Sequence, residues 1–211
     1  YHCDETVSYM VIEEGSWQLA DGSILEAGSL ESHKLSSKGH ETVSLTKNFE
    51  SASSPAVLTQ TQSFNGGDWV ITRTDKITDQ SFQVMMQEEE RLNGGIHATE
   101  TIGWLAIEQG IATDGDTIIE GGRTADAFTH QVNSHGFAAD FETSPTLLTK
   151  LDSYDGPDPG NSRIQSIDTN GFKAMIHEEQ SWDPEQFHTT ESLSYLAFGG
   201  SFGTVSGIEI S

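Results

Sequence analysis

The stretch HATETIGWLAIEQG, residues 97–110, recurs in two looser copies within this 211-residue chain. The earlier copy is HCDETVSYMVIEEG (2–15), and the later copy is HTTESLSYLAFGG (188–200). Successive side chains in the segment IGWLAIE (102–108) fall into two alternating sets that would point to opposite faces, and this period of two predicts a β-strand. A catalytic motif is normally needed only once, so the triple occurrence favours an architectural role for the His-x-x-Glu phrase.

Longer segments repeat at a fixed offset of 90 residues. SSPAVLTQTQSF (53–64) matches TSPTLLTKLDSY (143–154), and RTDKITDQSFQVMMQEEE (73–90) matches RIQSIDTNGFKAMIHEEQ (163–180). Such self-similarity indicates homologous structural units. We therefore predict two tandem modules, covering residues 14–109 and 110–200.

The two ends of the chain lie outside this frame. Residues 1–13 match the end of a module, so we expect the closing strand of a partial module there. Residues 201–211 contain GTVSGIEIS, which is similar to the start of a module, so we expect an opening strand. These surplus strands could pair within one chain or between chains.

Turn-forming residues separate the short β-rich runs. NGG occurs at 65–67 and 93–95, and DGPDPG occurs at 155–160. This spacing of glycine, proline, asparagine and aspartate is typical of antiparallel strands joined by tight turns. The predicted fold class is all-β, with each module an antiparallel β-sandwich of six or seven strands.

The composition excludes several partners. The chain has 33 acidic and 10 basic residues, a net charge of −23, which repels nucleic acid, anionic membranes and highly sulfated polymers. Salty surroundings or divalent cations would suit such a surface. No run approaches 18 apolar residues, so we expect no membrane insertion, and the one cysteine, Cys3, allows no internal disulfide.

The order of motifs within each module resembles that of the H-type lectins. The segments are FESASSPAVLTQTQSF, VITRTDKITDQSFQVMMQ and IGWLAIEQ, then FETSPTLLTKLDSY, SRIQSIDTNGFKAMIH and LSYLAFGG. The resemblance covers roughly residues 49–109 and 141–199. It implies six-stranded antiparallel sandwiches, usually trimeric, that bind galactose-type sugars through a strand arginine, neighbouring loops and an adjacent subunit.

The resemblance also implies candidate ligand-binding residues. The strand arginine maps to Arg73 and Arg163. The loop contacts fall on Glu89, Glu90 and His97 in the first module, and on Glu179, Gln180, Trp182 and His188 in the second. Trp182 and Trp69 lie in or beside loops, where an aromatic ring can either contact a sugar or pack against the protein.

Two metal hypotheses come from the residues themselves. His97 and Glu100 have side chains that suit zinc, but residues three apart in a regular strand point to opposite faces, so we favour a structural hydrogen bond. The acidic hairpins EEERLNGGIH (88–97) and EEQSWDPEQFH (178–188) could coordinate calcium or accept hydrogen bonds from sugars, or could be solvated tips.

These observations favour a non-catalytic, extracellular or cell-surface module that binds a polysaccharide or glycan, with two weak sites acting through avidity. No cofactor is expected apart from possible calcium. The alternative is a structural repeat of an adhesin or filament that assembles head-to-tail, or as a homo-oligomer, through its end strands. A glycan-cleaving enzyme is a third hypothesis, in which replacing Glu89 and Glu179 would abolish reducing-sugar release.

Overall fold

The computed structural model describes residues 5–49, 54–92, 94–114, 116–199 and 208–209, and within them the chain is all-β. One short 3-10 helix, η1 (Ser36–Lys38), interrupts the strands. Among these residues, no helix has the length and apolar character required to span a membrane. The strands are β1 (Gly15–Gln18), β2 (Ile24–Ser32), β3 (Glu41–Ser44), β4 (Ala56–Thr61), β5 (Val70–Asp75), β6 (Ser81–Glu88), β7 (Glu100–Ile107), β8 (Gly110–Asp114), β9 (Thr117–Arg123), β10 (Asn133–Gly136), β11 (Thr146–Leu151), β12 (Gly160–Asp168), β13 (Gly171–Glu178), β14 (Leu193–Gly199) and β15 (Ile208–Glu209).

The strands form antiparallel sheets whose order is repeated. The first half of the chain, β1–β7, contributes β1-β2-β7-β4 to a five-stranded sheet and forms a three-stranded sheet, β3-β6-β5. The second half, β8–β14, forms a four-stranded sheet, β11-β14-β9-β8, and a three-stranded sheet, β10-β13-β12. Each strand of the second half thus occupies the same place in its sheet as the strand seven positions earlier.

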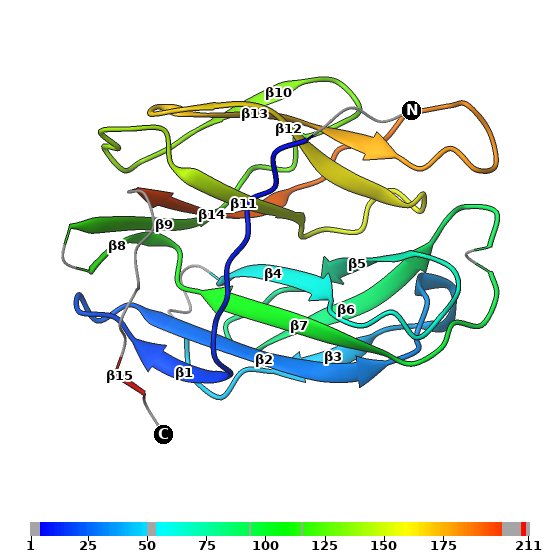
Figure 1. Cartoon of the computed structure of the whole chain (residues 1–211), viewed down its shortest axis with the longest axis horizontal. Helices are drawn as coiled ribbons and strands as arrows, with labels where there is room; N and C mark the ends of the chain where they lie inside the picture. Colours follow the sequence, from blue (N-terminus) through cyan, green and yellow to red (C-terminus); the bar gives the residue numbers. More distant parts are fainter. Residues whose placement is uncertain (1–4, 50–53, 93, 115, 200–207, 210–211) are drawn as a thin grey trace.

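The sheets are stacked as layers rather than set side by side (Figure 1). One apolar core lies within the first half and includes Phe82 and Ile102, and another lies within the second half and includes Phe172 and Leu193. A third core joins the two large sheets, with Leu105 of β7 and Leu196 of β14 among its members. The halves therefore share a hydrophobic interface.

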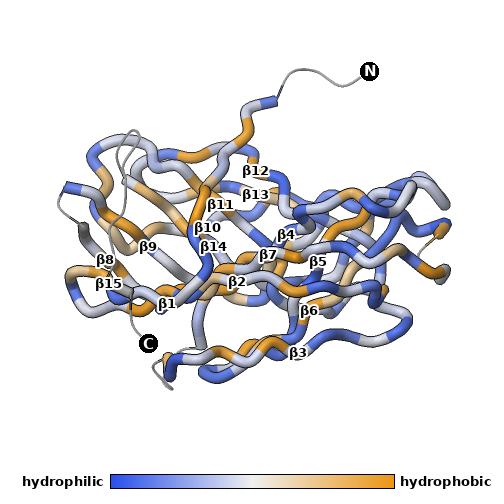
Figure 2. Tube along the Cα trace, turned by 60° about the horizontal axis from the view of Figure 1, so that its bottom comes forward, coloured by the Kyte–Doolittle hydropathy of each residue, from blue (hydrophilic) through white to orange (hydrophobic). Residues whose placement is uncertain are grey.

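This stacking explains the apolar character of the repeated phrase. Strand β7 lies inside the five-stranded sheet, between β2 and β4, and both of its faces are covered. Ile102 and Ala106 face the core of the first half, while Leu105 and Ile107 face the shared core. The alternation of side chains along β7 therefore separates two interiors, whereas Figure 2 shows hydrophilic residues both in the loops and along other strands.

The N-terminal segment corrects one expectation. Residues 5–13, the described part of the predicted closing strand at 1–13, contain no strand, and β1 begins at Gly15. The segment runs across the edges of the stacked sheets toward β1 (Figure 1). Met10 packs against the shared core, whereas Val7, Tyr9 and Val11 are exposed. Residues 5–13 form no backbone pairing with a neighbouring strand, so this segment does not extend a sheet.

The C-terminal segment contains a short strand. In the predicted range 201–211, β15 pairs antiparallel with β1, with Trp17 opposite Glu209 and Gln18 opposite Ile208. The remainder of that range, like residues 1–4 of the predicted N-terminal strand, lies outside the described residues. β15 thus extends the five-stranded sheet beyond β1.

Candidate functional site

The loops that carry the predicted binding residues lie at one end of the molecule (right side of Figure 1). They connect β4 with β5, β6 with β7, β11 with β12, and β13 with β14. Large apolar side chains are exposed on three of these loops: Phe64, Trp69, Leu92, Ile96, Trp182 and Phe187. Exposed aromatic rings at loop ends suit recognition of a partner with apolar faces.

A surface groove of about 420 Å³ lies beside these loops. Trp69 and Ile71 line it from the first half of the chain, and all its other lining residues come from the second half. Its lining residues are Trp69, Ile71, Pro159, Asn161, Ser162, Arg163, His177, Glu178, Glu179 and Gln180. The groove therefore combines the indole ring of Trp69 with many charged and neutral hydrogen-bonding groups, which could contact the apolar face and the hydroxyls of a polar ligand.

Three of the predicted residues line this groove. The guanidinium of Arg163 is half-exposed and pairs with Glu5 at 2.6 Å. Burial alone would raise the pKa of Glu179, but hydrogen bonds from Ser181 and from the backbone N–H of Glu90 lower it, so Glu179 is an acceptor. Gln180 is exposed and donates to the carbonyl of Pro184 at 2.9 Å.

Glu89, Glu90 and Trp182 do not line the groove. Glu90 accepts a hydrogen bond from the backbone of Trp182, whose ring is 70% exposed. Trp69, whose role the sequence left open, is 42% exposed and lines the groove. Sequence reasoning assigned no ligand role to Asn161 or His177, because an exposed polar residue on a strand carries no signal of its own.

The repeated His-x-x-Glu phrase forms a buried hydrogen-bonded triad in the first half. His97 Nδ1 lies 2.7 Å from Glu88 Oε1, and its Nε2 lies 3.2 Å from Glu100 Oε1. Glu100 also accepts hydrogen bonds from the Ser63 hydroxyl and the backbone N–H groups of Asn65 and Gly66. Although burial opposes ionisation, these bonds lower the pKa of Glu100. The carboxylate therefore holds the loop after β4.

The second half repeats the triad with equivalent residues. His188 Nδ1 contacts Glu178 Oε1, and its Nε2 lies 3.1 Å from Glu191 Oε1. Glu191 in turn accepts from Ser153 and from the backbone of Asp155 and Gly156, as Glu100 does from its own loop. Each member of one triad thus has a counterpart 90 or 91 positions along the chain.

These triads correct the predicted ligand roles of His97 and His188. The two histidines are 4% and 1% exposed, so neither presents a ring nitrogen to a ligand. The expectation that His97 and Glu100 point apart was also wrong, because His97 precedes β7, which begins at Glu100. Because His97 lies outside the strand, its side chain can reach that of Glu100, and the predicted structural hydrogen bond is present.

Arg73 also has a different role from its predicted one. Its guanidinium is 0% exposed and forms an ion pair with Glu191 at 2.6 Å, so it bridges the two halves. It donates to Gln87 at 3.0 Å and to the carbonyl of Ser153 at 3.1 Å, and it lies over the ring of Tyr154. Its repeat equivalent, Arg163, is instead half-exposed and pairs with Glu5.

Replacing Gly66 by alanine should destabilise the first triad. A Cβ atom at Gly66 would lie 2.4 Å from the ring of His97, and hydrogen bonds on both nitrogens prevent that ring from moving away. We expect a loss of about 1 to 3 kcal/mol in the free energy of unfolding, measured by urea denaturation.

Gly67→Ala is the matched control, because a Cβ there meets nothing within 4 Å. The control should change stability by less than about 0.5 kcal/mol. Equal effects of the two substitutions would contradict the packing of His97 over the loop.

A comparison with known proteins gives one distant similarity. The chain is 27% identical over 202 residues to Halomucin of Haloquadratum walsbyi (strain DSM 16790 / HBSQ001). The aligned region covers 95% of this chain, and the chain spans about 2% of the length of that curated relative. No protein-family model matches the chain, and no solved structure matches it.

Proposed function

We propose that this chain is a non-catalytic carbohydrate-binding unit that recognises a glycan or polysaccharide in the groove beside β12. The supporting observation is the lining of that groove, in which the ring of Trp69 lies among Arg163, Glu179 and Gln180. An indole face packs against the C–H side of a sugar ring, while the polar groups hydrogen-bond to its hydroxyls. The net charge of −23 favours neutral or mildly charged glycans.

The architecture in this proposal is that of two tandem sandwich modules similar to H-type lectins. The repeated strand order supports it. The groove is made from both modules, since Trp69 comes from the first and Arg163 from the second. Because Arg73 is buried, the proposal places one glycan-binding site in the two modules together, rather than one site in each module.

Binding to an immobilised glycan array tests this proposal. Trp69→Ala and Arg163→Ala should each weaken retention of the chain, because one removes the stacking surface and the other removes a hydrogen-bonding fork. Phe64→Ala is the control, since this ring is 75% exposed on the same loop as Trp69 but does not line the groove. Unchanged binding in Trp69→Ala and Arg163→Ala would exclude the groove as the site.

The location in this proposal is extracellular or at the cell surface. The distant similarity to Halomucin supports it. A high acidic charge also maintains solubility where salt screens the repulsion between carboxylates. In this setting the chain would act as one unit of a longer surface polypeptide.

A structural repeat that assembles through its end strands is the second candidate function. The pairing of β15 with β1 favours it, because the same antiparallel pairing made by a neighbouring chain would add a strand at this edge of the five-stranded sheet. Light scattering after size exclusion distinguishes the two. Growth of the particle mass with concentration supports assembly, whereas a constant mass with retention on a glycan column supports the lectin-like function.

A further inference from the structure

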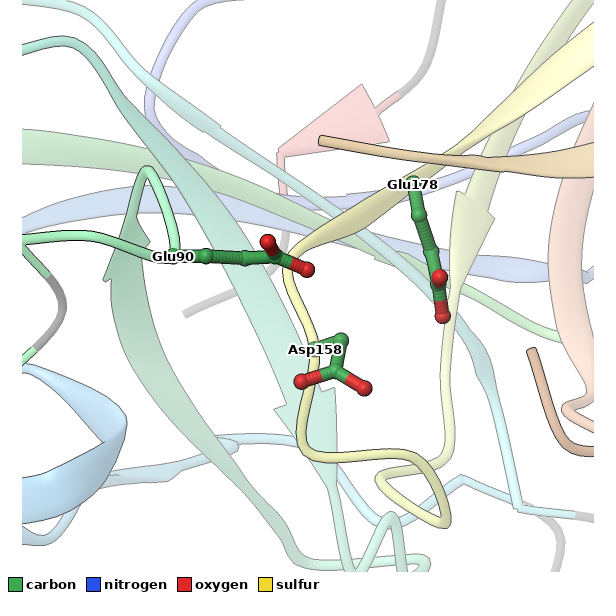
Figure 3. A group of neighbouring side chains, drawn as sticks. All are labelled: Glu90, Asp158 and Glu178. Atoms are coloured by element: carbon green, nitrogen blue, oxygen red, sulfur yellow. The ribbon is translucent and has the colours of Figure 1, made fainter. Parts of the chain in front are cut away.

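Three carboxylates from different parts of the chain converge beside the interface between the halves. Glu90 follows β6 in the first half, Asp158 lies in the loop between β11 and β12, and Glu178 ends β13. One oxygen from each lies within 4.8 Å of the others. Figure 3 shows the three side chains approaching one another from three separate segments.

Two carboxylate oxygens of this cluster are buried without a hydrogen-bond partner. The side chain of Glu178 is 1% exposed, and while its Oε1 contacts His188, its Oε2 has no partner. Glu90 Oε2 is likewise buried and unsatisfied. Buried polar oxygens are almost always satisfied by a donor, a water or an ion, so two of them in one cluster indicate a missing partner.

The charge of the cluster favours a cationic partner. Burial and the neighbouring Asp158 raise the pKa of Glu90, and burial, only partly offset by His188, raises the pKa of Glu178. In the described ranges, no lysine or arginine side chain forms an ion pair with these three residues. Neutralisation by protons or by a metal ion would remove this repulsion.

We propose that Glu90, Asp158 and Glu178 bind a divalent cation, calcium in particular, that ties the two halves of the chain together. Carboxylate oxygens alone suit calcium or magnesium better than zinc. Calcium accepts irregular geometry with ligands at about 2.3 to 2.6 Å, so any two of its ligands lie at most about 5.2 Å apart, and the three oxygens, all within 4.8 Å of one another, are inside that limit. Water molecules complete the coordination. This site does not depend on the carbohydrate-binding proposal.

Calorimetric titration of the chelator-treated chain with CaCl₂ in 150 mM KCl (about physiological ionic strength) tests the proposal. We expect one saturable site, with a dissociation constant of about 10⁻⁴ to 10⁻³ M as in weak protein calcium sites. Saturation should raise the melting temperature by about 5 °C. Asp158→Asn and Glu90→Gln should weaken binding about tenfold or more, because each removes a charged ligand.

The melting temperature measured without calcium separates an effect of each substitution on calcium binding from an effect on folding. Glu90→Gln should melt at the same temperature as the parent chain or higher, since it relieves repulsion within the cluster, and yet it should lose the response to calcium. Glu89→Gln is the charge-matched control on the neighbouring residue, which lies outside the cluster, and it should bind calcium as the parent chain does. Binding unchanged in Glu90→Gln and Asp158→Asn, or a melting shift reproduced by KCl of equal ionic strength, would overturn the proposal.

Discussion

Replacing Arg73 by methionine should lower the free energy of unfolding by about 3 to 5 kcal/mol. The substitution leaves Glu191 buried without its guanidinium partner, and it removes the hydrogen bond that joins β5 to the carbonyl of Ser153. Because these contacts connect the two halves, their loss weakens the interface as well as the ion pair. Urea denaturation followed by tryptophan fluorescence measures the effect.

Arg163→Met is the control supplied by the repeat itself. Arg163 occupies the equivalent position 90 residues later, but it is half-exposed and pairs with the exposed Glu5. Surface ion pairs contribute up to about 1 kcal/mol, so this variant should remain close to the parent chain. Adding Glu191→Gln to Arg73→Met should restore part of the lost stability, because the uncompensated charge is then absent. Equal losses in Arg73→Met and Arg163→Met would contradict the buried bridge.

Acid should destabilise this protein through Glu191. Burial alone would raise its pKa, but the hydrogen bond from His188, the charge of Arg73 and the bonds from Ser153 and Gly156 lower it to about 2, from an ordinary value of 4.5. A lowered carboxyl pKa stabilises the folded state above pH 4.5, and this contribution is lost as the pH falls from 4.5 towards 2. The difference corresponds to about 3 kcal/mol.

Comparing Glu191→Gln with the parent chain across that pH range measures this contribution. The stability gap between them should be largest above pH 4.5 and should close as the pH approaches 2. Glu100→Gln is the matched control, because Glu100 holds the equivalent loop in the first half without an arginine partner. Its pH-dependent gap should be smaller. A gap that does not change with pH would show that Glu191 does not contribute as an ionised group.

The strands were predictable because each repeated segment satisfies local rules. Alternation in residues 102–108 predicts β7, and the NGG turns bracket strands where expected. The antiparallel all-β class is confirmed, with η1 the one exception in the described ranges. The layered arrangement was not predictable, because a strand covered on both faces has no polar side to indicate where each sheet packs.

The candidate site was only partly predictable. Arg163, Glu179 and Gln180 line one groove, and the lectin resemblance named all three. It named Arg73 with equal weight, because equivalent positions in two repeats carry the same local sequence. The burial of Arg73 and Arg163 differs for a reason outside either repeat. Arg73 is covered by the second half of the chain, whereas the first half leaves Arg163 half-exposed.

The repeat, its strands and the residues that recur in both halves follow from the amino-acid order, since these depend on side-chain alternation and turn chemistry over short distances. The packing of the sheets sets which copies are buried, that His97 and His188 each join two glutamates, and that Glu90 meets Asp158 and Glu178. Such convergence depends on how the sheets stack, because stacking brings together residues about 90 positions apart and excludes water from some equivalent sites but not others.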